Sequence, residues 1–191
     1  MPDVTNGKRV AVLFTDGVER AELIQPLDAL REAGFEVDVL SIHDGQAQTM
    51  DHSEKADSVR IDKTVDQASP DDYEGLVLPG GVFNADKLRL NERAVAFVRE
   101  SFVAGLPIAV ICHGPWIMIE AEVVRGLTMT SYPSLKTDIR NAGGTWVDRE
   151  TVVDRAVVSS RNTSDLPAFC TQMIRLFVLG RQQSERVGLA A

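Results

Sequence analysis

The chain has 191 residues, of which 44% are hydrophobic and 25% charged, and its formal net charge is -8. This length and composition are typical of one globular domain with a sizeable core. The negative charge disfavours contact with the phosphates of a nucleic acid. The sequence has no apolar run long enough for a membrane span and no apolar stretch ahead of its first predicted strand. We therefore expect a cytoplasmic protein with no signal peptide and no membrane contact.

The predicted elements alternate between strands and helices. Residues 8–15 form a first strand, and residues 16–42 supply a loop, a helix ended by Gly34, and a second strand. Residues 43–67 lack a helical period and are typical of short hairpin-like strands at a sheet edge. Residues 75–81 then form a buried strand that ends in a glycine pair.

The second half continues the alternation. Its predicted elements are a helix at 91–106, a buried strand at 107–111, a helix from Gly114, a short strand at 127–133, a helix at 134–144, two paired strands at 151–161 that turn near Asp154 and Arg155, and an amphipathic helix that starts at a Ser164 or Asp165 cap. This order predicts an α/β fold with a mostly parallel, doubly wound sheet and helices on both faces. We expect a single domain over residues 1–191, with a core of about 8–180 and flexible termini.

The sequence "PIAVICHGPW" at residues 107–116 places Cys112 and His113 where a buried strand breaks into a helix. Such an elbow exposes a nucleophile above the edge of a sheet, and the helix N-terminus is expected to lower the pKa of the thiol. The alternative is a small buried cysteine at the end of a strand. Cys170, the other cysteine, is in register with Phe169, Met173 and Phe177, so we expect it to pack in the core and to form no disulfide.

Ligands of doubly wound sheets bind outside the carboxyl ends of the strands. The residues predicted to meet there are 16–22, Gly80 and Gly81, Cys112 and His113, and Arg161 and Asn162. The backbone N–H groups of the glycine pair and of His113 suit an oxyanion hole beside the thiol, although a plain turn explains the glycines equally well.

Two glutamates open the first helix, and such carboxylates usually face water. Glu22 is unusual because it lies in the apolar sequence "AELIQP", so burial over the strand ends would raise its pKa and keep it protonated beside the thiol.

The positions of the histidines limit the possible reaction classes. None lies beyond His113, which excludes an amidotransferase with a downstream His-x-Glu pair. Adjacent elbow residues point differently, so His113 would act as a base only if a carboxylate orients its ring.

The chain resembles the PfpI branch of the ThiJ/PfpI superfamily. The motifs that carry the likeness cover residues 8–179 and stand in this order: "AELIQP", "LVLPGG", "RLNE", "VICHGPW", "RG", "TSYPSLKTDIRNAGGTWVD" and "VVSSRNTSDLPAF". The resemblance implies a flavodoxin-like sandwich that forms a homodimer or a hexamer. It also implies an intracellular protease, a general stress protein, or a glyoxalase- or deglycase-type enzyme.

By position, Cys112 resembles the family nucleophile, Glu22 the protonated acid in contact with it, and His113 the histidine that follows. Glu19 matches a second pocket acid, and Tyr132 a pocket tyrosine, although an aromatic residue on a short strand is more often core packing. Protease-like members place a carboxylate from a neighbouring subunit on the histidine. Asp86 is the nearest candidate here, in a segment one residue longer than that pattern and with aspartate in place of glutamate.

These residues favour a stress-protective enzyme in which the Cys112 thiolate attacks a small reactive carbonyl, of the glyoxalase III or deglycase type. A cysteine peptidase completed by Asp86 in trans is one alternative. A redox sensor or holdase, in which Cys112 is oxidised, is another. A small carbonyl or a peptide is the expected substrate, and we expect no cofactor and no metal.

Overall fold

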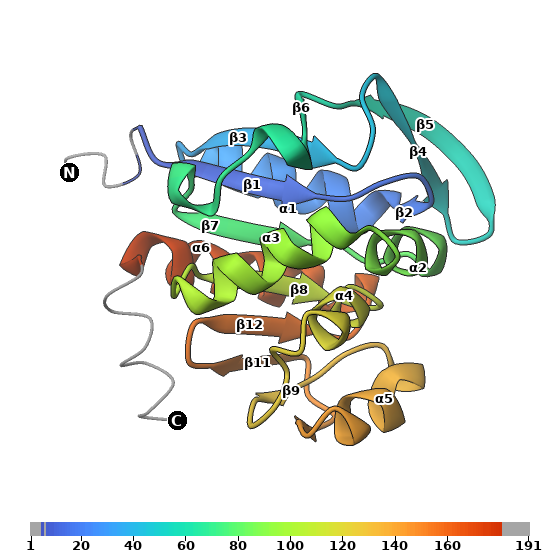
Figure 1. Ribbon diagram of the computed structural model, residues 1–191, viewed down its shortest axis with the longest axis vertical. Coiled ribbons are helices and arrows are strands. Elements are labelled where there is room, and N and C mark those ends of the chain that lie inside the picture. Colours follow the sequence, from blue (N-terminus) through green and yellow to red (C-terminus); the bar gives the residue numbers. More distant parts are fainter. Residues whose placement is uncertain (1–4, 6, 181–191) are drawn as a thin grey trace.

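The computed structural model describes residue 5 and residues 7–180. Its centre is a seven-stranded sheet in the order β11-β12-β8-β7-β1-β3-β6 (Figure 1). All neighbours are parallel except β11 and β12. The strands are β1 Arg9–Leu13, β3 Glu36–Ser41, β6 Lys63–Thr64, β7 Gly75–Leu78, β8 Ile108–Ile111, β11 Thr151–Asp154 and β12 Val157–Ser160. The predicted doubly wound α/β sandwich of flavodoxin type is confirmed.

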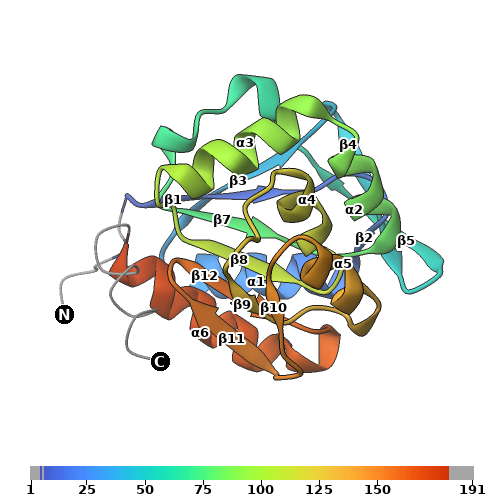
Figure 2. The ribbon, with the colours of Figure 1, turned by 60° about the horizontal axis from the view of Figure 1, so that its bottom comes forward.

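Helices cover both faces of this sheet (Figure 2). On one face lie α2 Val82–Arg89, α3 Glu92–Val103 and α4 Pro115–Glu120, and on the other lie α1 Arg20–Glu32 and α6 Leu166–Leu179. The central strands β7 and β8 are apolar throughout because successive side chains enter opposite cores. In β8, for example, Ile108 and Val110 join one buried cluster, and Ala109 and Ile111 join the other. None of the helices within the described ranges is long and apolar enough to cross a membrane.

A small second sheet stands beside the main one. Residues 43–67 form the predicted hairpin, β4 Gln46–Asp51 against β5 Glu54–Arg60, but β4 pairs with β2 Val18–Glu19 rather than with the main sheet. Only β6 reaches the main edge, next to β3. The hairpin therefore projects from the sandwich over the carboxyl ends of the strands (Figure 1).

The remaining elements follow the prediction with local corrections. Helix α2 has no clear signal in the sequence, because its N-cap Gly81 offers no capping side chain and its first residues, Val82 and Phe83, are exposed. The helix predicted to start at Gly114 runs over Pro115–Glu120. Beyond it, β9 Thr128–Met129 pairs with β10 Thr145–Trp146, and α5 Lys136–Asn141 lies between them.

Two further predictions concern helix α6, and a third concerns the ends of the chain. Asp165 occupies the N-cap position of α6, but its side chain makes no cap and accepts hydrogen bonds from Arg161 instead. Cys170 is half-buried and packs against the α1–α6 core, as predicted. The segment beyond Gly180 and most residues before Lys8, predicted to be flexible, lie outside the described residues.

We expect the Phe177→Ala variant to lose about 3–5 kcal/mol of unfolding free energy, as is usual when a buried phenylalanine leaves a cavity. Phe177 is fully buried and packs edge-on against Phe35, with ring centroids 6.4 Å apart. Urea denaturation measures the loss. Val103→Ala is the control because Val103 is 79% exposed, and its unfolding free energy should stay within about 0.5 kcal/mol of the parent value. Equal effects of the two substitutions would contradict this assignment of the core.

Candidate active site

Cys112 occupies the predicted elbow between β8 and α4. Its backbone has φ 61°, in the left-handed region that residues other than glycine seldom adopt. The turn is held because the Cys112 N–H donates to the Ser160 carbonyl at 3.1 Å and its carbonyl accepts from the Tyr132 N–H at 2.9 Å. The thiol lines a pocket, and the residue is 7% exposed. A strained and anchored backbone of this kind is typical of functional positions.

Glu22, in the first turn of α1, is buried against the thiol. The residue is 1% exposed, and its Oε2 accepts a hydrogen bond from the Gly80 N–H at 3.0 Å. Burial raises the pKa of the Glu22 carboxyl to about 8, although its hydrogen bonds with Cys112 and Gly80 act in the opposite direction. The carboxyl is therefore mostly protonated at neutral pH, as the apolar sequence around it predicted.

The expected lowering of the thiol pKa is wrong. Burial raises the pKa of Cys112 far above its usual range, and Glu22 raises it further once its own carboxyl is ionised. Hydrogen bonds from the backbone N–H groups of Gly81 and His113 act in the opposite direction but do not overcome the burial. Thiolate formation at this site consequently needs a base.

His113 is placed to be that base. Its Nδ1 lies 3.2 Å from the Cys112 sulfur, so the two neighbouring side chains converge instead of pointing apart. The ring stacks on Tyr132, with centroids 4.7 Å apart, and meets Trp116 edge-on at 5.3 Å. Burial lowers the pKa of His113, which leaves the imidazole neutral and able to accept a proton. The partner of Nε2 is the Ser134 hydroxyl at 3.2 Å, where the sequence reading required a carboxylate.

The glycine pair has a different role at each position. A side chain at Gly80 would collide with the Glu22 carboxyl and lie 2.6 Å from the Cys112 Cβ, so only glycine allows these two groups to meet. The Gly80 N–H is used by Glu22 and is not free for an oxyanion hole. The N–H groups of Gly81 and His113 both hydrogen bond toward the sulfur, so the predicted donor set is reduced from three to two.

The pocket around the thiol has a volume of about 410 Å³. Its walls are β2 and α1, Gly81 with the start of α2, the elbow, the segment at Asn162 and Thr163, and the end of β4 with the turn of the β4–β5 hairpin. Its lining residues include neither lysine nor arginine: Gly17, Glu19, Glu22, Met50, His52, Ser53, Gly81, Val82, Phe83, Cys112, His113, Tyr132, Asn162 and Thr163. The sequence reading missed the hairpin contribution because no strand pattern reveals where a second sheet will fold back.

Glu19 lies at the rim of this pocket and is 9% exposed. Its Oε2 accepts a hydrogen bond from the backbone N–H of His52 at 3.1 Å and lies 3.5 Å from the imidazole Nδ1. The His52 side chain is 79% exposed even though the residue lines the pocket. With Asp51, these two residues offer donor atoms within 4.8 Å of one another, the one such group among the described residues.

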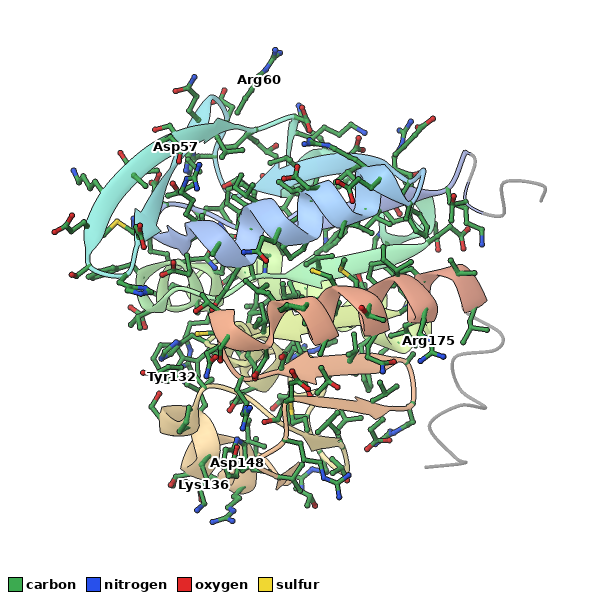
Figure 3. The ribbon with its side chains drawn as sticks, turned by 180° about the vertical axis from the view of Figure 1, so that it is seen from behind. Asp57, Arg60, Tyr132, Lys136, Asp148 and Arg175 are labelled. Atoms are coloured by element: carbon green, nitrogen blue, oxygen red, sulfur yellow. The ribbon has the colours of Figure 1, made fainter. Side chains whose placement is uncertain are left out.

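The other predicted site residues have different outcomes. Tyr132 is 41% exposed and lines the pocket, so the core-packing alternative is wrong, and Figure 3 shows it toward the same side of the molecule as the β4–β5 hairpin. Asp86 is exposed on α2 and does not line the pocket, so its role in a neighbouring subunit stays a prediction. Arg161 is engaged by Asp148 and Asp165, each at 2.8 Å, and does not line the pocket.

Residues 8–176 match the model of the DJ-1/PfpI family. The chain belongs to the DJ-1/PfpI family. A Pyrococcus horikoshii protein named as a deglycase is 44% identical over 168 residues, covering 88% of this chain and 98% of the relative. General stress protein 18 of Bacillus subtilis is 35% identical, covering 89% and 98%. The crystal structure of an Anabaena variabilis two-domain protein with DJ-1/ThiJ/PfpI-like and ferritin-like domains is 34% identical with a TM-score of 0.83, covering 88% of this chain and 47% of that one.

The raised pKa of Glu22 predicts that stability falls with pH between the ordinary glutamate pKa of 4.5 and about 8. In this window the folded state keeps a proton that the unfolded state has released, so the contribution present below the window is lost above it. Glu22→Gln has no such proton. From pH 5 to 8 its melting temperature should fall less than that of the wild type, and Glu32→Gln, an exposed site on the same helix, should behave like the wild type. Parallel curves for all three proteins would show that Glu22 ionises normally.

Proposed function

We propose that this chain is a stress-protective, cysteine-dependent enzyme of the glyoxalase III or deglycase type. The observation that carries the proposal is the position of the Cys112 sulfur, which lies in the pocket 3.2 Å from the neutral imidazole of His113 and in hydrogen-bond contact with the buried Glu22 carboxyl. A nucleophile between a proton acceptor and a proton donor suits addition to a carbonyl group.

The first step forms a thiolate and a carbon–sulfur bond. The Cys112 S–H bond breaks, and its proton goes to Nδ1 of His113. The sulfur then adds to the aldehyde carbon of a 2-oxoaldehyde, and the protonated Glu22 gives its proton to the carbonyl oxygen, which yields a hemithioacetal. The N–H groups of Gly81 and His113, which hydrogen bond toward the sulfur, are the donors expected to stabilise the oxygen on which negative charge develops.

The second stage needs no external oxidant. The Glu22 carboxylate removes the proton from the former aldehyde carbon while the protonated His113 gives its proton to the ketone oxygen, which forms an enediol. Glu22 then returns its proton to the former ketone carbon, and the hydroxyl on the former aldehyde carbon gives its proton to His113, which yields the thioester of a 2-hydroxy acid. Water hydrolyses the thioester, which releases the acid and restores the thiol. In an amine adduct of the same dicarbonyl, the amine leaves with a proton when sulfur takes its place on carbon.

The pocket supports this substrate class in its size and charge. A volume of about 410 Å³ admits a small carbonyl or one modified side chain. Two glutamates line it without a lysine or arginine, which disfavours an anionic substrate such as a phosphorylated sugar. The name of the Pyrococcus horikoshii relative supports the deglycase reading, and that of the Bacillus subtilis relative supports a role in stress.

We expect the wild-type protein to consume methylglyoxal and to release the amine from its adducts. Cys112→Ser should abolish both activities, and Glu22→Gln should lower kcat by about 100-fold or more because the proton donor is lost. Cys170→Ser is the matched control, since Cys170 lies on α6 outside the residues that line the pocket, and its rates should equal those of the wild type. Product formation can be followed by liquid chromatography. Turnover that survives in Cys112→Ser would refute the thiol mechanism.

A cysteine peptidase is the second candidate, because Nε2 of His113 lies next to Ser134 on an exposed turn that a neighbouring copy of the chain can approach. In this mechanism Asp86 of a second copy in a homodimer or hexamer orients the imidazole. Asp86→Asn should then abolish cleavage of a fluorogenic peptide by the assembled protein and leave methylglyoxal turnover unchanged. Undiminished peptide cleavage by Asp86→Asn would exclude the in-trans acid.

A further inference from the structure

The Nε2 atom of His113 has an unusual partner for a catalytic histidine. Cysteine and serine hydrolases use a carboxylate or an amide to fix the imidazole that activates the nucleophile. Here Nε2 lies 3.2 Å from the Ser134 Oγ. The nearby carboxylate of Asp138 is engaged elsewhere, because it accepts a hydrogen bond from the Trp116 indole at 2.9 Å. Among the described side chains, the serine hydroxyl is thus the group in hydrogen-bond contact with the far side of the ring.

We propose that Ser134 is the positioning residue of His113, with its hydroxyl accepting the Nε2 hydrogen so that Nδ1 faces the Cys112 sulfur as a bare acceptor. This inference rests on the proposed function, in which His113 takes the thiol proton. When the S–H bond breaks, the proton moves to Nδ1, and the Nε2–H bond to Ser134 remains in place. The hydroxyl can accept this hydrogen in both charge states of the ring.

The segment that carries Ser134 is tied to the elbow itself. The Tyr132 N–H donates to the Cys112 carbonyl at 2.9 Å, and the Leu135 N–H donates to the Tyr132 carbonyl at 3.0 Å. Pro133 starts the short 3-10 turn Pro133–Leu135, and its ring restricts the backbone φ. Tyr132 stacks on the imidazole from the same segment. This segment thus contacts the imidazole twice, through the Tyr132 ring on its face and the Ser134 hydroxyl at Nε2. The backbone of the same segment also holds the Cys112 carbonyl.

The charges around the imidazole explain why a hydroxyl suffices. Cys112 faces it from the pocket side, and burial keeps the carboxyl of Glu22, which contacts the thiol, protonated at neutral pH. On the Trp116 side, the Arg89 guanidinium lies 5.7 Å from the indole centroid and pairs with Glu120 at 2.9 Å. A neutral serine adds no negative charge to this balance, whereas a carboxylate at Nε2 would favour the imidazolium. The resting cysteine and histidine are therefore neutral, and the thiolate forms only as substrate is attacked.

The assignment of Ser134 to Nε2 excludes a carboxylate of a neighbouring subunit from the same position. Nε2 carries a single hydrogen, so Ser134 and a carboxylate from a neighbouring subunit cannot both accept it in a linear hydrogen bond. If Ser134 positions the ring, Asp86 does not, and the site is complete within one chain for attack on a carbonyl.

The test measures the reactivity of the Cys112 thiol without any substrate. We would follow alkylation of the Cys112 peptide by iodoacetamide, using mass spectrometry, over a pH range of about 5–10, in which histidines titrate and a base-assisted reaction of the thiol is expected to change. Ser134→Ala should lower the rate near neutral pH about five-fold, the effect expected from one neutral hydrogen bond. Ser134→Thr should restore the rate. Ser134→Asp should raise it and shift the His113 pKa upward in an NMR titration.

Ser58→Ala, at an exposed position on β5, is the matched control and should give the wild-type profile. A Ser134→Ala profile identical to that of Ser58→Ala, or an Asp86→Asn profile shifted as predicted for Ser134→Ala, would overturn the assignment. Failure of the proposed function looks different. In that case the wild type consumes no methylglyoxal, yet the Ser134 variants still shift the alkylation profile.

Discussion

Helix α1 and the elbow after β8 can approach each other because residue 80, which lies between them, has no side chain. Gly80 leaves room for the Glu22 carboxyl to reach the thiol of Cys112, and its backbone N–H holds that carboxyl in place. The same contact accounts for the electrostatics of the site. A carboxyl buried this deeply retains its proton at neutral pH, and a thiol buried beside it resists ionisation. The chemistry therefore follows from a steric opening at one backbone position.

The high pKa of the thiol has a functional interpretation. A permanently ionised cysteine would be exposed to oxidation and to nonproductive electrophiles, since the thiolate is the reactive form. In this site the sulfur remains a thiol until a proton acceptor removes its hydrogen. His113 is such an acceptor because burial keeps it neutral and the aromatic rings of Tyr132 and Trp116 hold it against the sulfur. Cys112 and His113 therefore suit general-base activation of the thiol better than a preformed thiolate–imidazolium ion pair.

Much of this arrangement could be predicted from the sequence. Apolar runs such as "IAVI" at Ile108–Ile111 identify strands buried on both faces, and the Cys-His-Gly sequence after it identifies the elbow. The unusual burial of Glu22 followed from its apolar neighbours. The thiol pKa could not be predicted, because it depends on how deeply the folded chain buries a residue. The role of Ser134 was also hidden, since a serine in a polar turn resembles any other until the turn is seen against the histidine.

The residues that line the pocket come from two different sheets. Cys112, His113 and Glu22 all come from the ends of the main sheet and the helices packed on it, whereas Met50, His52 and Ser53 come from strand β4 and the turn of a hairpin that the main sheet does not pair with. Strand β5 is largely exposed, so its length and the sequence of its turn are free of core packing. Changes in that hairpin can therefore reshape the entrance while the reacting atoms keep their spacing. In the proposed function, substrate range and catalytic chemistry are thus encoded in separate stretches of the chain and can vary independently.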